Sequence, residues 1–181
     1  MAESPRITNY QDVSMFAVDE GKRDRVFEAQ TEAVLMWTTT DGWPVGVMHR
    51  FVWHDGRIWM TCAEQRVRVK ALRARPKSCV SVTSEGTSVG ADINIVAKTL
   101  AVVHPDDDRA TKEWFFPLLA ARQRKGDPAA QAKFVERVDH PGRVVIELVP
   151  QSWITYDGNR LDAALAGHDY DPTAKKRSHN D

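Results

Sequence analysis

The segment from Ala33 to Pro76 constrains the possible folds of this chain more than any other part of its sequence. It contains three apolar, strand-like stretches, which are separated by two turn signals, Asp41-Gly42-Trp43-Pro44 and His54-Asp55-Gly56. A short basic segment, residues 66–75, follows the third stretch and ends before Pro76. Because short turns join antiparallel neighbours, this order predicts a small antiparallel sheet with a cationic helix beside one of its ends.

The strand pattern continues beyond this segment. Apolar residues alternate with period two over residues 45–53, and similar stretches occur at 80–82, 93–103 and 144–148. Apart from residues 104–142, turn signals recur between these stretches without an intervening long helix, which is typical of an antiparallel sheet that closes into a barrel. The predicted fold class is therefore mainly β with added helices, an antiparallel β-barrel with a helical insertion before its last strands.

Residues 104–142 carry the signals of two helices. Asp106-Asp107-Asp108 provides an N-cap and an acidic first turn for the first helix, and Asp127-Pro128 begins the second. The face of the first helix that we expect to be buried carries Trp114, Leu118 and Ala121.

The length of 181 residues is sufficient for one domain with a substantial core. We expect a single barrel domain over residues 1–156, with the helical insertion at about 104–142. From residue 157 onward the sequence becomes polar and Ala-rich, and we expect a C-terminal tail over residues 157–181.

The charge and hydropathy of the whole chain indicate neither nucleic-acid nor membrane partners. The 25 basic and 25 acidic residues cancel, so any anion site has to come from local clustering. No apolar stretch approaches the roughly 20 residues that span a bilayer, and the N-terminal residues lack the apolar core of a secretion signal. Cys62 and Cys79 lie in apolar strand-like stretches without CxxC spacing, which favours reduced thiols. We expect a soluble, cytoplasmic protein.

The basic segment can form either an anion site or a solvated helix face, and its spacing leaves both open. Arg66, Lys70 and Arg73 share one face, while Val69 and Leu72 can anchor the helix to the sheet. The free N–H groups and the dipole at a helix start favour negative charge, and Thr61 just upstream can supply a hydroxyl. Charge runs are commonly solvated surface, so it is the order of the elements that favours an anion site.

The histidines and possible nucleophiles identify no catalytic centre. Six histidines are scattered without the spacing of a metal site, and no metal is predicted. His49 lies on the apolar side of its strand, where it is either a core histidine with one hydrogen-bond partner or a ligand-binding or catalytic residue. Because the sequence contains no nucleophile, phosphate-loop or dinucleotide-binding motif, the catalytic residues stay unknown.

Three stretches together form a more specific pattern: residues 33–48 (AVLMWTTTDGWPVGVM), residues 51–61 (FVWHDGRIWMT), and the basic segment with Leu72 and Pro76. This pattern resembles the pyridoxamine 5′-phosphate oxidase-like superfamily of flavin-binding proteins. The resemblance covers the central strands to about Val103 and, more loosely, Val144–Tyr156. It implies an antiparallel split β-barrel of the FMN-binding type, and a homodimer with the cofactor at the subunit interface.

The resemblance also implies which residues hold the cofactor. Thr61 and Cys62 correspond to phosphate contacts on the third strand. Arg68 takes the position of the usual phosphate-binding lysine, and the strand along the flavin ring corresponds to Val47–Val52. The candidate cofactor-binding residues are Val47, Met48, His49, Arg50, Thr61, Cys62, Arg66, Arg68 and Lys70.

The function that the resemblance implies is a flavin-dependent oxidoreductase, which binds FMN and transfers electrons or hydride to or from a small organic substrate. The alternatives are a deazaflavin-dependent reductase and a non-catalytic split-barrel protein that binds flavin or haem, since the superfamily contains all of these and fold does not settle function. The C-terminal arginine-containing motif of pyridoxamine-phosphate oxidases is not recognisable, so oxidation of vitamin B6 is not expected. The substrate and the direction of electron flow stay open.

Overall fold

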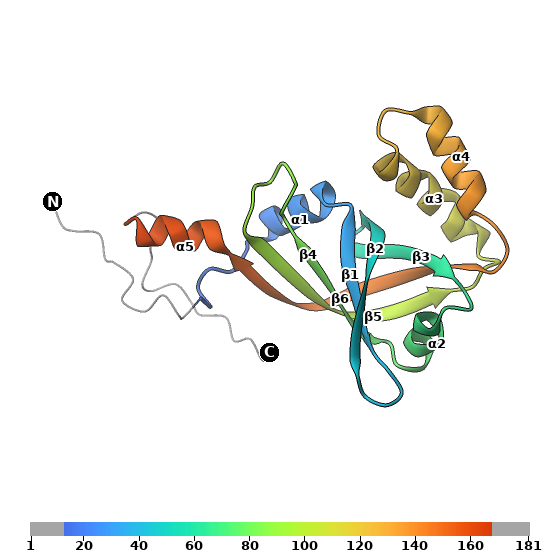
Figure 1. The fold of residues 1–181 in the computed structure, drawn as a ribbon, viewed down its shortest axis with the longest axis horizontal. Coiled ribbons are helices and arrows are strands. Elements are labelled where there is room, and N and C mark those ends of the chain that lie inside the picture. The colour runs from blue at the N-terminus through green and yellow to red at the C-terminus, as the bar shows by residue number, and fades with distance from the viewer. Residues whose placement is uncertain (1–12, 168–181) are drawn as a thin grey trace. The chain divides into compact units, whose positions relative to one another are not determined.

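The computed structural model of the protein describes residues 13–167 (Figure 1). Its helices are α1 (Glu20–Ala29), α2 (Val67–Ala74), α3 (Arg109–Gln123), α4 (Pro128–Val138) and α5 (Gly158–Leu165). Its strands are β1 (Glu32–Thr38), β2 (Pro44–His54), β3 (Arg57–Ala63), β4 (Lys77–Thr83), β5 (Ile93–His104) and β6 (Arg143–Asp157). None of the helices in this part of the chain combines the length and the apolar character that crossing a bilayer requires.

The strands close into an antiparallel barrel in the order β1-β2-β3-β6-β5-β4. Gly42 and Gly56, at φ 90° and 68°, occupy the turns on either side of β2, where a side chain would be strained. Helices α3 and α4 lie between β5 and β6 in the chain, so the insertion precedes the last strand. The predicted fold class, an antiparallel barrel that is mainly β with added helices, is confirmed.

The chain forms two compact units. The described residues of the first unit are 13–30, 82–96 and 152–167, and the second contains residues 31–81 and 97–151. In the first unit α5 begins at Gly158, within the segment expected to be a tail, and the buried Asp157 before it lies 2.6 Å from Lys22 Nζ. The boundaries of a domain over residues 1–156 and a tail over 157–181 remain a prediction.

Within the second unit, β2 changes its pairing partner in the middle of the strand. Residues 44–50 pair with β1, whereas residues 51–54 pair with β3, so that Phe51 lies opposite Met60. Continuing this antiparallel register would bring Arg50 and His49 level with the residues that follow Met60 on β3. There, however, β3 pairs with β6 and β2 with β1. The two strands separate at this point, next to the end of β3.

A hydrophobic cluster packs the helical insertion against the barrel strands of the second unit. Its members are Val52 of β2, Trp59 of β3, Val145 of β6, Phe115, Phe116, Leu119 and Ala120 of α3, and Phe134 and Val138 of α4. Because the insertion shares one core with the barrel, it can contribute side chains to a site on the barrel.

The buried face of α3 differs from the predicted one. Leu118 is 39% exposed and Ala121 is also exposed, while Phe115 and Phe116 are fully buried. Two adjacent phenylalanines offer more apolar surface than Leu118 and Ala121 do, so burying them rotates the helix by about one residue. Trp114 lies at the edge of the cluster, partly buried.

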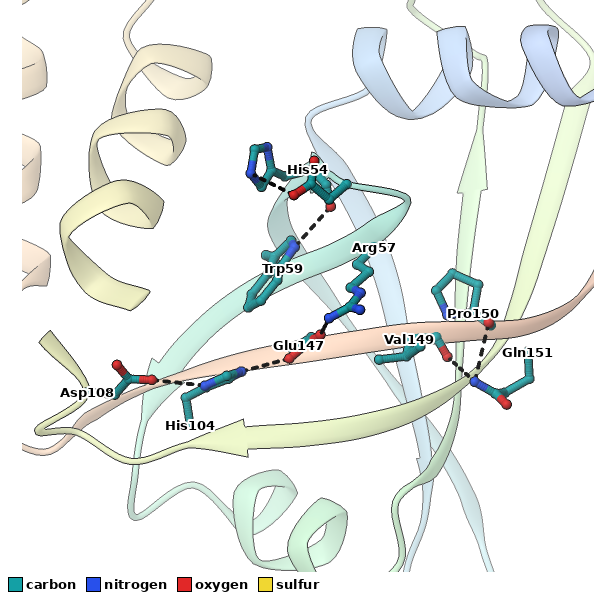
Figure 2. A network of polar contacts seen from close by, with 10 residues as sticks. His54, Arg57, Trp59, His104, Asp108, Glu147, Val149, Pro150 and Gln151 are labelled. Carbon is teal, nitrogen blue, oxygen red and sulfur yellow. Dashed lines mark hydrogen bonds and ion pairs between the residues drawn. The ribbon is translucent and has the colours of Figure 1, made fainter. Parts of the chain in front are cut away.

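A polar network also connects the insertion with the barrel strands (Figure 2). The buried carboxylate of Glu147 on β6 accepts a hydrogen bond from Arg57 of β3 and lies 2.9 Å from His104 Nε2 of β5. The other ring nitrogen of His104 lies 3.0 Å from Asp108, whose carboxylate caps α3 by accepting from the Thr111 N–H at 3.0 Å. The network therefore fixes the start of α3 relative to three strands.

We expect Glu147→Gln to lower the free energy of unfolding by about 1.5–3 kcal/mol, because a neutral amide replaces a buried carboxylate that contacts two donors. Urea denaturation followed by circular dichroism measures the change. Glu136→Gln is the matched control, since Glu136 is exposed on α4 and forms no ion pair with residues 13–167. Its effect should stay within about 0.5 kcal/mol. Equal losses in the two variants would contradict a stabilising role for the network.

Candidate functional site

A pocket of about 580 Å³ lies in the second unit, where the separated part of β2 meets the end of β3. Met48–Arg50 of β2, Thr61–Ala63 of β3, Arg66 and Arg68 at the start of α2, and Arg143 of β6 line it. The insertion adds Leu119 from α3, and Phe134, Arg137 and Val138 from α4. The pocket is therefore built from four barrel-side segments and two inserted helices.

Backbone pairing fixes the end of β3 against the start of β6. Ala63 lies opposite Arg143, and the N–H of Glu64 donates to the carbonyl of Gly142 at 2.8 Å. Arg143 Nε donates to Thr61 Oγ1 at 3.2 Å, and the Thr61 hydroxyl donates to the Val144 carbonyl at 2.7 Å. The hydroxyl proton of Thr61 is thus committed to the backbone, and this side chain positions the guanidinium of Arg143.

The start of α2 brings positive charge to the pocket. Val69 and Leu72 are buried and anchor the helix, as predicted. Arg66 is the N-cap residue, with φ −65° and ψ 137°, and its side chain makes no capping hydrogen bond. The dipole of α2 and its first N–H groups, which no N-cap side chain satisfies, therefore lie beside Arg66 and Arg68 in the pocket wall.

Arg68 and His49 form the central polar contact of the pocket, with Arg68 Nη1 3.0 Å from His49 Nε2. A guanidinium can only donate, so Nε2 accepts and the proton of the neutral ring resides on Nδ1. Burial, together with the charges of Arg68 and Arg143, lowers the pKa of His49 to about 4. His49 has the one hydrogen-bond partner expected of a core histidine, yet it is only half-buried and lines the pocket.

The pocket concentrates positive charge. Five arginines line it, Arg50, Arg66, Arg68, Arg137 and Arg143, and no lining residue is acidic. Only Arg50 has a carboxylate nearby within the described residues, at 3.7 Å from Glu32. Burial lowers the pKa of the Arg143 guanidinium; the interaction with Cys62 opposes this, and the charges of Arg137 and Arg66 add to it. Burial also raises the pKa of the Cys62 thiol, which is therefore neutral at pH 7.

Most of the residues that the sequence singled out lie together in the structure. Seven of the nine candidates line the pocket: Met48, His49, Arg50, Thr61, Cys62, Arg66 and Arg68. Val47 is outside the lining, and Lys70 lies in a second groove instead. Their binding of a cofactor remains a prediction.

Sequence reasoning missed the part of the pocket that comes from the insertion and β6, including Leu119, Phe134, Arg137 and Arg143. The Gly142-Arg143 pair at the start of the last strand was a possible signal for Arg143, because that strand had to pair with the sheet. Nothing in the spacing of α4 indicated that Arg137 would face the end of β3.

The second groove, of about 1120 Å³, runs along α2 and the turn between β1 and β2. It shares Arg66 with the pocket and contains Lys70, Arg73 and Arg75. Arg73 is paired with Glu64 at 2.7 Å, and Arg75 donates to the Thr38 carbonyl at 3.1 and 3.2 Å. Of the predicted cationic face, Arg66 and Lys70 have no carboxylate within ion-pair distance in residues 13–167.

Comparison with known proteins identifies the fold. No family model and no curated protein matches the sequence. Among solved structures, a conserved hypothetical protein from Mycobacterium tuberculosis matches with a TM-score of 0.70 and 14% identity, covering 87% of this chain and 92% of that one. A "Putative Pyridoxamine 5'-phosphate oxidase" from Listeria innocua has a TM-score of 0.57 and 19% identity, covering 75% and 96%. An F420 reductase has a TM-score of 0.55 and 20% identity, covering 76% and 98%.

At these identities the likeness concerns the fold alone. The chain has the split-barrel fold of the pyridoxamine 5′-phosphate oxidase-like proteins. The resemblance that the three sequence stretches predicted is thus confirmed at the level of the fold.

The chemistry of the pocket fits a cofactor that carries an anionic group. Arg68 Nε is buried and has no hydrogen-bond partner among the described residues, although its Nη1 contacts His49. The apolar side chains of Met48, Leu119, Phe134 and Val138 provide surface for a planar ring system. Within residues 13–167 there is no group of His, Cys, Asp or Glu side chains that could hold a metal ion.

We expect His49 to make the protein less stable as the pH falls from 6.5 to about 4. The ordinary pKa of 6.5 applies to the unfolded chain and the lowered value to the folded chain, so only the unfolded state takes up the proton in this range. The free energy of unfolding then decreases by at most about 1.4 kcal/mol per pH unit as the pH falls. Well above pH 6.5, His49 contributes no pH dependence to it.

In His49→Gln, which keeps an acceptor for Arg68, this part of the acid sensitivity should disappear. Urea denaturation of both proteins at pH 7.5 and pH 5 measures the difference, and titration of the His49 ring protons by NMR gives the midpoint directly. Parallel pH profiles for the two proteins, together with a midpoint near 6.5, would show that the ring is not held neutral by its surroundings.

Proposed function

We propose that the protein is a split-barrel oxidoreductase that binds FMN in this pocket and transfers electrons or hydride between the flavin and a small organic substrate. The observation that carries the proposal is the environment of Arg68. Its guanidinium lies at a helix start without a side-chain cap and has a buried Nε without a partner in the described residues, in a pocket without carboxylates. Such a combination favours a phosphate group.

In this proposal Arg66 and Arg68 hold the phosphate together with the N–H groups of Val67 and Arg68, since the N–H of Val69 already donates to the Arg66 carbonyl at 2.9 Å. Arg68 also donates to His49, which keeps the ring of His49 in one tautomer with its Nδ1–H available as a donor. The segment Met48–Arg50, where β2 is separated from β3, lies along the flavin ring. The flavin supplies the electron chemistry, so no acid–base pair is needed among the lining residues.

The apolar part of the pocket has a separate role in this proposal. Leu119, Phe134 and Val138 belong both to the pocket wall and to the core of the second unit, so they are held rigidly. They limit the access of water to the ring and leave room for a substrate of limited size.

We further propose that the protein is a homodimer, in which the second copy covers exposed apolar surface. On β5 the side chains of Leu100 and Val102 are 37% and 46% exposed, while the alternating Thr99 and Ala101 are buried. Two adjacent apolar side chains on the outer face of a barrel strand are typical of a contact surface. The resemblance to homodimeric proteins makes a second copy of this chain the expected partner.

A deazaflavin in place of FMN is the second candidate, and the second groove favours it. The groove continues from Arg66 past Lys70, whose ammonium has no carboxylate partner in the described part of the chain. A long acidic tail extending from the phosphate could lie there. Lys70→Ala should therefore weaken binding of the deazaflavin coenzyme but not of FMN, if the deazaflavin is the natural cofactor.

A non-catalytic flavin-binding protein differs from an oxidoreductase in one measurement. Bound FMN should be reduced by a nicotinamide nucleotide and reoxidised by an added acceptor in an oxidoreductase, and neither step should be accelerated in a storage protein.

Haem is less compatible with His49, because Nε2 already accepts a hydrogen bond from Arg68 and would have to release it to bind iron.

We expect Arg68→Ala to weaken FMN binding by about ten- to a hundredfold, since a charge-assisted hydrogen bond of roughly 1.5–3 kcal/mol is lost. Titration of the purified protein with FMN, followed by flavin fluorescence, measures the affinity. Arg75→Ala is the control on the same helix, because Arg75 contacts the Thr38 carbonyl outside the pocket. Equal losses in both variants would indicate diffuse electrostatics, and no loss for Arg68→Ala would refute the phosphate site.

We expect the double variant Leu100→Lys/Val102→Lys to be a monomer at micromolar concentration, because two charges would be buried in the proposed dimer contact. Sedimentation equilibrium of wild type and variant measures the change. Ala129→Lys/Ala132→Lys adds the same charge at exposed positions of α4 and should leave the dimer intact. A monomeric wild-type protein, or a dimeric β5 variant, would rule out this interface.

A further inference from the structure

The arginines of the pocket that have no carboxylate partner in the described residues come from three elements. Arg66 and Arg68 lie at the start of α2, whereas Arg137 lies in the last turn of α4 and Arg143 opens β6. The first pair is sufficient for the phosphate of the proposed cofactor. The second pair has no role in that proposal and was not singled out by the sequence.

Arg143 is oriented by contacts on one side only. Its Nε donates to Thr61 Oγ1 at 3.2 Å, and Thr61 is itself fixed to the Val144 carbonyl. The two terminal nitrogens of Arg143 make no hydrogen bond or ion pair with the described residues, although the side chain is half-buried and lines the pocket. A guanidinium held in this way presents two parallel N–H donors, the geometry that matches a carboxylate or phosphate.

Arg137 has a similarly defined position. Its guanidinium carbon lies 5.4 Å from the centre of the Phe134 ring, and no carboxylate in residues 13–167 is within ion-pair distance. Arg137 and Arg143 line the same pocket, and the charge of Arg137 adds to burial, the main cause of the lowered pKa of Arg143. Two cations that repel each other in one pocket wall are stabilised by an anion between them.

The net positive charge of the pocket also favours a second anionic ligand. Arg66, Arg68, Arg137 and Arg143 have no carboxylate partners in the described part of the chain and carry four positive charges. A phosphate monoester supplies about two negative charges. The remaining excess, together with the apolar side chains of Leu119 and Phe134 in the same wall, suits a second ligand with an acidic group and an apolar body.

We infer that Arg137 and Arg143 form a second anion subsite, which binds the carboxylate of a small organic acid, the substrate, beside the cofactor. The inference rests on the proposed function for the presence of the cofactor, but the subsite itself is made only of residues from α4 and β6. It assigns the helical insertion a role in choosing the substrate.

The test uses benzoate as a planar acid and benzamide as its neutral counterpart, titrated by calorimetry into the full-length protein with and without saturating FMN. We expect benzoate to bind at least tenfold more tightly than benzamide. Arg143→Gln and the exposed Arg137→Gln should each reduce benzoate affinity about tenfold and change FMN affinity less than threefold. Arg68→Ala should reduce FMN affinity by at least about tenfold and change benzoate affinity less than threefold.

Equal affinities for benzoate and benzamide, or unchanged benzoate binding in both glutamine variants, would overturn the subsite. A loss of FMN binding in those variants without a loss of benzoate binding would also overturn it, since the two arginines would then belong to the cofactor site. If the wild type does not bind FMN, the proposed function is refuted but the subsite is not. The benzoate titrations without FMN then still test the subsite. Because Arg137 is exposed, its variant retains the fold even if Arg143→Gln does not.

Discussion

The pairing of β3 with β2 on one side and β6 on the other is the constraint on which the site depends. Met60 pairs with both Phe51 and Ile146, while Ala63 pairs only with Arg143, because β2 has already separated. A slip of one residue would turn every side chain of β3 to the opposite face of the barrel. Ile58 and Met60 are fully buried on one face of β3, while Trp59 packs with the insertion on the other, so a slip would disrupt both packings and displace Thr61 and the start of α2.

Charged side chains of the second unit lie in two kinds of surroundings. In the network around Glu147 the buried carboxylate is satisfied by Arg57 and His104. In the pocket, five arginines and a neutral histidine line one cavity, without a carboxylate among the lining residues. Unbalanced charge in a partly desolvated site costs folding free energy, so it is informative about function where it persists. The overall charge of the chain is zero, and this contrast is visible only in the structure.

The sequence was sufficient for the order of the strands and for which residues gather on the barrel side of the pocket, but not for helix α5. Alternating apolar residues, two glycine turns and the anchors Val69 and Leu72 act locally, so their effects can be deduced from neighbouring residues. The position of the insertion depends on packing between distant segments, which explains why Leu118 was expected to be buried and Phe115 was not. Arg137 and Arg143 become neighbours of the end of β3 only through that packing and through the β3–β6 register.

The side chains that Leu119, Phe134 and Val138 contribute to the pocket are also members of the core that fastens the insertion to the barrel. Any movement of these side chains that opens the pocket would therefore also loosen the core. A ligand that packs against these three residues will slow the hydrogen exchange of the α3 and α4 amides as it binds, because it is bound only when the helices are docked. The insertion is thus both a wall of the pocket and part of the core of the second unit.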